Sequence, residues 1–228
     1  MADIAESPAP ETSPLRSQAI DRSLDGARAR AEHRVQRFLD ATTELIIEKG
    51  GLDFTVQDVV ERSTQSLRSF YQFFDGKQHL LLAVYEDAVR AAAEELETIC
   101  GGIDDPLERL HISIVTIYEW SEREPSPATP SPHLTVRSMA AFIFELMATD
   151  RDSVVVATEP LFSLLLSVLE QAADVGVVRA DNLRADGAFL MQTTMFNAFG
   201  TAPVGDAVGR KARAEALWER FLRGLAND

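Results

Sequence analysis

The chain has 228 residues, of which 46% are hydrophobic, with twelve Gly, ten Pro, one Cys and a formal net charge of −14. This length suits one large helical domain or two smaller ones. The single cysteine, Cys100, excludes an internal disulfide and is typical of a reducing cytoplasm. Residues 1–30 contain no apolar run of signal-peptide length, and no stretch reaches the roughly 18 consecutive apolar residues of a membrane span. We therefore expect a cytoplasmic protein with no membrane partner.

The acidic charge is unevenly distributed along the chain. Residues 1–14 hold three acids and no base, residues 15–80 hold ten basic and ten acidic groups, and residues 81–228 hold twelve basic and twenty-three acidic groups. Because basic side chains supply most non-specific affinity for DNA, the net charge argues against nucleic acid. The neutral segment, however, keeps a DNA-binding interpretation open, since arginines are concentrated near its start: Arg16, Arg22, Arg28, Arg30, Arg34 and Arg37.

The N-terminal part predicts a disordered tail followed by a helix. Residues 1–27, rich in Ala, Pro, Ser and Glu, are typical of a disordered tail. The next pattern predicts a helix from Ala31 to Lys49, with Gly50-Gly51 as its end. Its inward positions are Val35, Phe38, Leu39, Leu45 and Ile46.

Residues 53–82 predict two short helices and the start of a third. The first, Thr55 to Arg62, has its valines on one face, and Thr55 can cap it. A polar break at residues 63–65 follows, and Ser66 can cap the second helix, which Asp75-Gly76 ends. Two short helices joined by a turn of three or four residues are typical of a helix-turn-helix.

The rest of the chain also shows helical periodicity. Helices are expected at residues 77–100, 106–120, 134–147, 161–173, 184–199 and 211–225, with Pro160 in a first helical turn. Residues 122–133 contain four prolines and predict a loop. No strand pattern is present, so the predicted fold is all-α, with a DNA-binding domain at residues 28–78 and a helical body at residues 79–228.

The N-terminal third combines a helix that ends in Gly, a Thr-initiated helix, a second helix with a Tyr, and a Leu-rich third helix. The residues concerned are Ala41, Glu48 to Gly50, Thr55-Val56, Val59, Ser66, Phe70-Tyr71, Phe74, Lys77 and Leu80 to Leu82. In this combination and spacing the segment resembles the TetR family of bacterial transcriptional regulators. Thr64 stands where the family usually has Gly, Gln65 replaces a small apolar residue, and Leu67 replaces a polar or basic one. The resemblance implies a repressor that binds double-stranded DNA and is released by a small-molecule effector bound in the body.

Candidate DNA contacts lie around the second helix of the helix-turn-helix. Arg68 suits a bidentate contact to guanine, and Gln65 suits one to adenine. Leu67 either contacts a thymine methyl or packs under the first helix. Arg28 and Arg30 either reach a neighbouring groove or remain solvated. The residues that resemble the family's phosphate contacts are Thr55, Ser66, Ser69, Tyr71, Gln72 and Lys77; for Tyr71 a core aromatic is the alternative.

The helical body carries the candidate effector pocket. We expect an apolar or weakly polar effector, because few basic residues are available there to hold an anion. The alternative is that these residues form ordinary core. They are Trp120, Met139, Phe142, Met147, Phe162, Met191, Met195, Phe196 and Asn197.

One short recognition helix reads few bases, so a homodimer on a palindromic site is expected. Its interface would combine the helix at residues 184–199 with an apolar face of the last helix, although that face could also be core. The face consists of Leu217, Trp218, Phe221, Leu222 and Leu225.

Enzyme chemistry is not expected. The four histidines have no metal-ligand spacing, and no glycine-rich phosphate loop or nucleophile elbow is present. We therefore expect no catalytic residue, metal or cofactor. The alternative function is a helical ligand-binding or interaction protein whose DNA-binding head has lost its activity.

Overall fold

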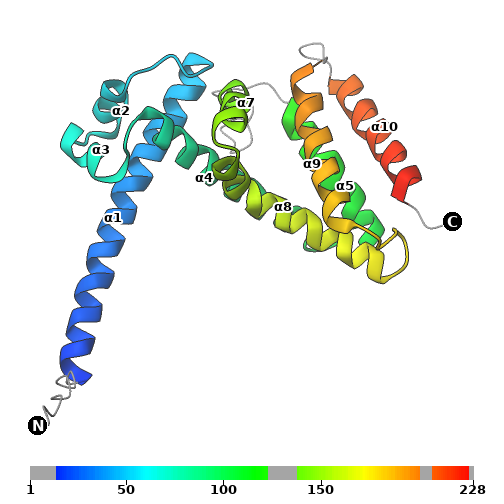
Figure 1. Ribbon diagram of the computed structural model, residues 1–228, viewed down its shortest axis with the longest axis horizontal. Helices are drawn as coiled ribbons and strands as arrows, with labels where there is room; N and C mark the ends of the chain where they lie inside the picture. The colour runs from blue at the N-terminus through cyan, green and yellow to red at the C-terminus, as the bar shows by residue number, and fades with distance from the viewer. Residues whose placement is uncertain (1–13, 123–137, 201–206, 226–228) are drawn as a thin grey trace, which may run out of the picture.

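The computed structural model describes residues 14–122, 138–200 and 207–225. These residues form helices arranged as a head and a body, which the long helix α4 connects (Figure 1). The all-α prediction is confirmed. The helices are α1 (Pro14–Lys49), α2 (Val56–Ser63), α3 (Leu67–Phe73), α4 (Lys77–Cys100), α5 (Pro106–Glu122), α7 (Ala140–Thr149), α8 (Arg151–Asp174), α9 (Leu183–Gly200) and α10 (Ala207–Leu225).

The head has an aromatic core. The ring of Phe38, from α1, meets Phe70 and Phe74 edge-on, with centroids 5.6 and 6.0 Å apart. All three side chains are buried, together with Leu80 and Val84 of α4. Such edge-to-face pairs add to the free energy gained by burial. This cluster fixes α3 against α1 and the first turns of α4.

Helix α1 is longer than the sequence pattern predicts. It begins at Pro14 rather than Ala31, so residues 14–27, which we assigned to a disordered tail, are helical. Ala, Arg, Leu and Gln in this segment have high helix propensity, and Arg28 pairs with Glu32 one turn later at 2.8 Å. The added turns project from the head (Figure 1), and Leu24 is 62% exposed.

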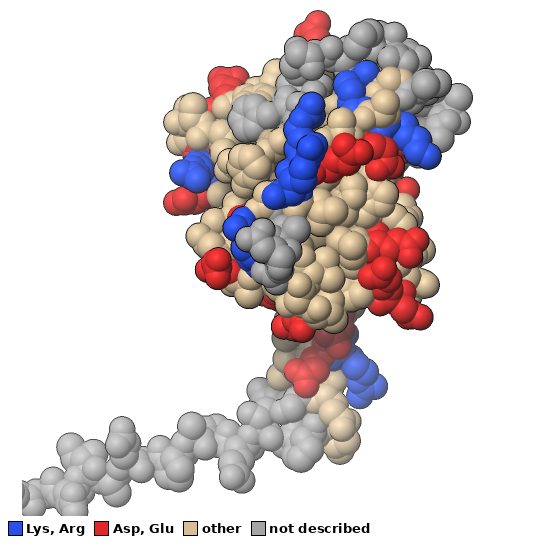
Figure 2. All heavy atoms as spheres, turned by 90° about the vertical axis from the view of Figure 1, so that its right-hand side faces the viewer, with Lys and Arg blue, Asp and Glu red and all other residues tan. Residues whose placement is uncertain are grey.

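The body is built around α5, which packs against α8, α9 and α10. His111 of α5 contacts α10 twice, through a hydrogen bond of 2.7 Å to Glu215 and ring packing on Trp218 at 4.9 Å. Helix α4 packs along α8 and so belongs to both head and body. Figure 2 faces the end of the body and shows several clusters of Asp and Glu side chains on its surface.

Helix α8 differs from the prediction that Pro160 lies in a first turn. The helix begins at Arg151, with Asp150 accepting a hydrogen bond from the Ser153 N–H at 3.3 Å, and Pro160 lies in its interior. Proline removes one backbone hydrogen bond there. The helix continues because one of its faces stays buried beyond the proline, through Leu161, Leu165, Val168, Leu169 and Ala172. By length and composition α8 would also suit a membrane span, a property that core helices of soluble proteins share.

The remaining boundaries agree closely with the sequence pattern. Helix α4 has both predicted ends, and α5, α9 and α10 extend the predicted ranges by a few residues. Helix α7 begins at Ala140, within the predicted range of 134–147. The predicted loop at residues 122–133 lies outside the described residues, apart from Glu122 at the end of α5.

Candidate nucleic-acid interface and ligand pocket

Both predicted helix caps in the head are confirmed. The Thr55 hydroxyl accepts a hydrogen bond from the Asp58 N–H at 3.2 Å, and the Asp58 carboxylate accepts one from the Thr55 N–H at 2.7 Å. These hydrogen bonds, first that from the Thr55 backbone, lower the pKa of Asp58. Ser66 caps α3 by accepting from the Ser69 N–H at 3.0 Å. Capping fixes where each short helix begins.

The turn between α2 and α3 is braced by α1. Thr64 adopts a left-handed conformation, with φ of 52°, which a β-branched residue rarely does. The Arg37 guanidinium donates to the Ser63 carbonyl and to the Thr64 hydroxyl. The Gln65 amide donates to the Arg34 carbonyl at 2.9 Å. These bonds hold the turn in the conformation that a glycine would adopt without strain.

The start of α3 presents free side chains to solvent. Leu67 is 44% exposed, so it does not pack under the first helix, and Tyr71 is 59% exposed, so it is not a core aromatic. Arg68 and Gln72 are also exposed. Within the described residues Arg68 makes no hydrogen bond or ion pair, so its guanidinium is available to a ligand.

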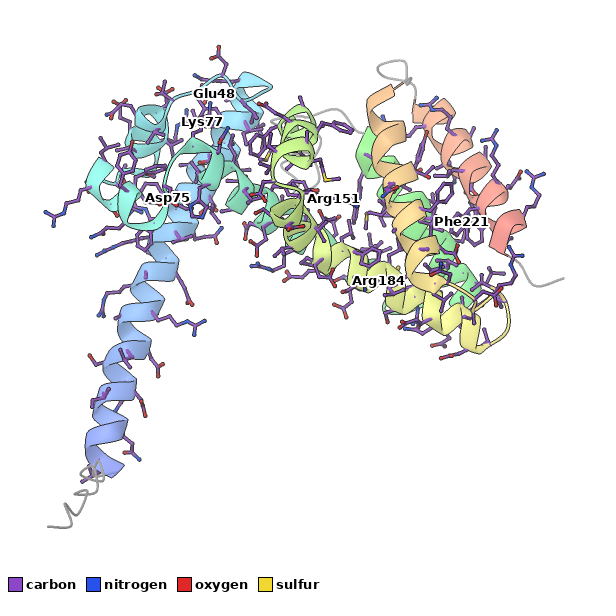
Figure 3. The ribbon with its side chains drawn as sticks, in the orientation of Figure 1. Glu48, Asp75, Lys77, Arg151, Arg184 and Phe221 are labelled. Carbon is purple, nitrogen blue, oxygen red and sulfur yellow. The ribbon has the colours of Figure 1, made fainter. Side chains whose placement is uncertain are left out.

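Two predicted DNA contacts already have hydrogen-bond partners within the protein. The Gln65 side chain, assigned to adenine, is used by the Arg34 carbonyl and by the Ser69 hydroxyl, which donates to it at 3.4 Å. The Lys77 ammonium, assigned to phosphate, donates to the carbonyls of Leu52 and Phe54 at 2.6 and 2.5 Å (Figure 3). It also lies 4.3 Å above the Phe54 ring, and desolvation lowers its pKa. Sequence spacing alone could not show that these groups are already satisfied.

Arg28 and Arg30 lie on the projecting part of α1, where both side chains are exposed. Arg28 is paired with Glu32 at 2.8 Å, and an exposed pair of this kind contributes little to stability. The structure therefore places these arginines on the part of α1 that projects from the head (Figure 1).

A cavity of about 310 Å³ lies between α4, α7, α8 and α9. Each of α7, α8 and α9 contributes residues spaced three and four apart, so one face of each helix forms a wall. The cavity is lined by Tyr85, Ala140, Ile143, Phe144, Met147, Arg151, Val154, Val155, Thr158, Glu159, Phe162, Arg184, Ala188, Met191 and Gln192.

Three of the predicted pocket residues line this cavity: Met147, Phe162 and Met191. Trp120 and Met139 are buried in the core, and Phe142 packs against it, so the core alternative holds for these three. The side chains of Met195, Phe196 and Asn197 lie outside the described residues. The hydrophobic character of a residue could not distinguish core positions from cavity-lining positions, because the same residue types occupy both.

The cavity is more polar than the sequence suggested. Arg151 and Arg184, from the first turns of α8 and α9, line it (Figure 3), which contradicts the expectation that few basic groups are available. Glu159 lines it as well. Deeper inside, the Tyr85 hydroxyl lies 3.3 Å from that of Thr158. Among the described residues no cluster of three His, Cys, Asp or Glu could hold a metal.

The predicted dimer face of α10 is largely used within the chain. Trp218 and Phe221 are buried, and Trp218 packs on His111 of α5. Leu217 and Leu222 are half-buried against the core, and the Leu225 side chain lies outside the described residues. Instead, α9 exposes Phe189, with 62% of its surface accessible. The sequence pattern did not single out Phe189, because it lies between the buried positions Gly187 and Leu190 and is not itself part of the buried face of α9.

Comparison with known proteins agrees with this geometry. Residues 38–84, from the aromatic core of α1 into α4, match the sequence model of a protein family, the bacterial regulatory proteins of the tetR family. The HTH-type transcriptional regulator BetI of Brucella anthropi is 27% identical over 89 residues, which cover 39% of this chain and 46% of that relative. The sequence match thus spans less than half of the relative's length.

Two solved structures share the fold of nearly the whole chain. RolR, in complex with resorcinol, has a TM-score of 0.65 at 15% identity and covers 87% of this chain and 90% of its own. FadR from Bacillus subtilis, in complex with stearoyl-CoA, has a TM-score of 0.58 at 13% identity, with 83% and 98% covered. At these identities the likeness concerns the fold. The resemblance to the TetR family of bacterial transcriptional regulators is confirmed over residues 38–84, the helix-turn-helix and the helices that flank it.

Proposed function

We propose that the protein is a ligand-responsive transcriptional repressor that binds a palindromic DNA site as a homodimer. The observation that carries the proposal is the exposed start of α3, where Arg68 has no partner among the described residues while its neighbours Ser66 and Gln65 fix the helix in place. A rigid helix that presents free side chains at its N-terminal end is the form of a major-groove reader.

Each exposed side chain of α3 suits one kind of DNA contact. The Arg68 guanidinium matches guanine O6 and N7, and Leu67 matches a thymine methyl. Tyr71 and Gln72 suit phosphate oxygens, which position the helix without specifying sequence. Thr55 and Ser66 contribute through the exposed helix N-termini that they cap, and Ser69 lies in the first turn of α3.

The projecting part of α1 extends the same interface. Arg28 and Arg30 lie on it, and its free end is on the side of the molecule away from α9 and α10 (Figure 1). Arginines on an exposed arm suit phosphates or a neighbouring groove, as the arms of other helical DNA-binding domains do. The acidic body then remains distant from the DNA, which reconciles DNA binding with a net charge of −14.

A homodimer follows from the small size of the reading surface. Helix α3 has only seven residues, so one copy reads few base pairs. The exposed Phe189 of α9, with the half-buried Leu217 and Leu222 of α10, offers an apolar surface for a two-fold contact. The buried Trp218 and Phe221 support this surface from beneath.

Effector binding acts through α4. This helix contributes Leu80 and Val84 to the core of the head, and the next residue, Tyr85, lines the cavity. A small molecule with a mainly apolar body that fills the cavity therefore contacts the helix that carries the head. By linkage, an effector that weakens DNA binding must itself bind more weakly to the DNA complex. A cytoplasmic location is consistent with this role.

Selection of bound DNA from a random pool tests the proposal. We expect a palindrome with half-sites about one or two helical turns apart, bound more weakly as salt is raised. Recovery of no preferred sequence, together with no gel shift at low salt, would favour a ligand-binding protein with an inactive head.

A further inference from the structure

The basic and acidic side chains that line the cavity are unequal in number, and this affects which ligands the cavity accepts. Two arginines and one glutamate line it, so the walls carry one excess positive charge. The Glu159 carboxylate accepts a hydrogen bond from the Ser163 hydroxyl at 2.7 Å. Neither arginine forms an ion pair with a described residue. In a chain with thirty-six acids and twenty-two bases, this is an unusual place for uncompensated positive charge.

Arg184 is already oriented for a planar anion. Its guanidinium carbon lies 5.0 Å from the centre of the Phe162 ring. Packing on an aromatic face restricts the side chain but leaves the N–H groups at the edge of the guanidinium free. A carboxylate can accept two of them in parallel. Arg184 therefore loses less conformational freedom on binding such a ligand than a fully mobile arginine would.

The two hydroxyl groups that line the cavity, those of Tyr85 and Thr158, offer no free donor to an anion. The Thr158 hydroxyl donates to the Val154 carbonyl at 2.7 Å, so the Tyr85 hydroxyl donates to Thr158 at 3.3 Å. Both hydroxyl protons are thereby used within the protein. A ligand that entered with its charge inward would bury that charge without a partner, which is strongly unfavourable. The charge of a bound anion must face the arginines at the rim.

The apolar walls continue from Arg184 along α8. Phe162, beneath Arg184, and Val154 both line the cavity and are eight residues apart, which is roughly 12 Å along a helix. Phe144 and Met147 of α7 border the same stretch. The space thus suits an elongated apolar or aromatic body that begins at the charged rim.

We infer that the effector is an amphiphilic monocarboxylate, with its carboxylate on Arg184 and its apolar body along α8. The inference rests on the proposed function for the existence of an effector, but it concerns only the chemistry that the cavity selects. Arg151, at the other end of the cavity, adds positive potential without that packed orientation.

Calorimetric titration of the full chain with three probes that share one apolar body tests the inference. The probes are phenylbutanoate, phenylbutanamide and phenylbutylamine, which carry an anionic, a neutral and a cationic head. We expect phenylbutanoate to bind about tenfold or more tightly than the amide, because a hydrogen bond to a charged group is stronger than one to a neutral group. In Arg184→Gln this preference should disappear, while the amide binds as it does to the wild type.

The matched control is Arg90→Gln, an exposed arginine of α4 paired with Glu86 outside the cavity, which removes the same charge and should keep the preference. Equal binding of amide and acid, tighter binding of the amine, no binding of any probe, or an unchanged acid affinity in Arg184→Gln would each overturn the inference. DNA selection on the same preparation reports separately on the proposed function, so the two can fail independently.

Discussion

The head and the body of this protein are packed in different ways. The head is closely packed: the rings of Phe38, Phe70 and Phe74 are buried against one another, and Arg37, Gln65 and Lys77 each donate to backbone carbonyls around the turns. The body has a partly open cavity of about 310 Å³ between four helices and exposes apolar side chains beside it. A closed, braced unit holds one geometry, whereas an incompletely filled one can rearrange around a ligand.

Helix α4 shows how the two kinds of packing work together. Its first two turns belong to the head, through Leu80, Leu81 and Val84, and its later turns pack along α8. Because Tyr85 lies beside the cavity, a change in the cavity reaches the head through a single continuous helix. Under the proposed function, the closely packed head would read DNA, and the body around the cavity would set the position of the head.

The largest expected effect comes from breaking the closed packing of the head. Phe70→Ala should lower the free energy of unfolding by about 3–5 kcal/mol, because it leaves a cavity among fully buried rings. Phe144→Ala is the matched change in the body, and it should cost about 1 kcal/mol or less, since this ring is 38% exposed beside an existing cavity. Urea unfolding measures both; equal losses would remove the distinction between the two regions.

Removal of the Arg68 side chain, a proposed base contact, should weaken DNA binding without changing the free energy of unfolding. Arg68→Ala should weaken binding to the selected site by about 1–3 kcal/mol and relax discrimination at one base pair. The control Arg90→Ala removes the same charge from α4 and should retain that discrimination. Fluorescence anisotropy with single-base variants of the site measures both. Uniform weakening on every sequence would make Arg68 a phosphate contact.

At the strained turn we expect a smaller change in stability, and Gly and Ala should rank in the opposite order from that in a helix. At a helical position Ala is more stable than Gly, but at Thr64, with φ of 52°, Gly should be more stable than Ala by about 1 kcal/mol. Both variants lose the hydrogen bond from Arg37, so their difference isolates the backbone conformation. Thermal unfolding of Thr64→Gly and Thr64→Ala makes the comparison, and a more stable Ala variant would show that the turn is unstrained.

The smallest effect concerns the capping box of α2. Hydrogen bonds from Thr55 lower the pKa of Asp58, so the folded state favours the ionised carboxylate. The stability that this contributes is present above the ordinary Asp pKa of 3.8 and is lost as the pH falls below it through the lowered value. Asp58→Asn should flatten this part of the stability profile of the head. An unchanged acid profile would show that the cap is not coupled to ionisation.

The same contrast explains what could be predicted from the sequence. The caps at Thr55 and Ser66 and the helices of the head follow from contacts between residues close in the chain, so the pattern of a short segment predicts them. The roles of Gln65 and Lys77 could not be predicted in this way, because their partners, the Arg34 and Leu52 carbonyls, are backbone groups that any sequence would supply.

The cavity was predicted only in part, for a different physical reason. Met147, Phe162 and Met191 were expected, but Arg151 and Arg184 were not, since an arginine in a first helical turn looks like solvated surface until a neighbouring helix is in place. Similarly, Trp218 carries the same apolar signal whether it faces α5 or a second copy of the chain. Only the packing of α10 on α5 decides between the two.

The most direct test of the central claim is the coupling between the cavity and DNA. The dissociation constant for the selected DNA site is measured by anisotropy with and without phenylbutanoate at a concentration that saturates the cavity in calorimetry. The account predicts that the saturated protein binds DNA about 5- to 150-fold more weakly, the usual range of allosteric coupling. An unchanged DNA affinity at full occupancy of the cavity would contradict it.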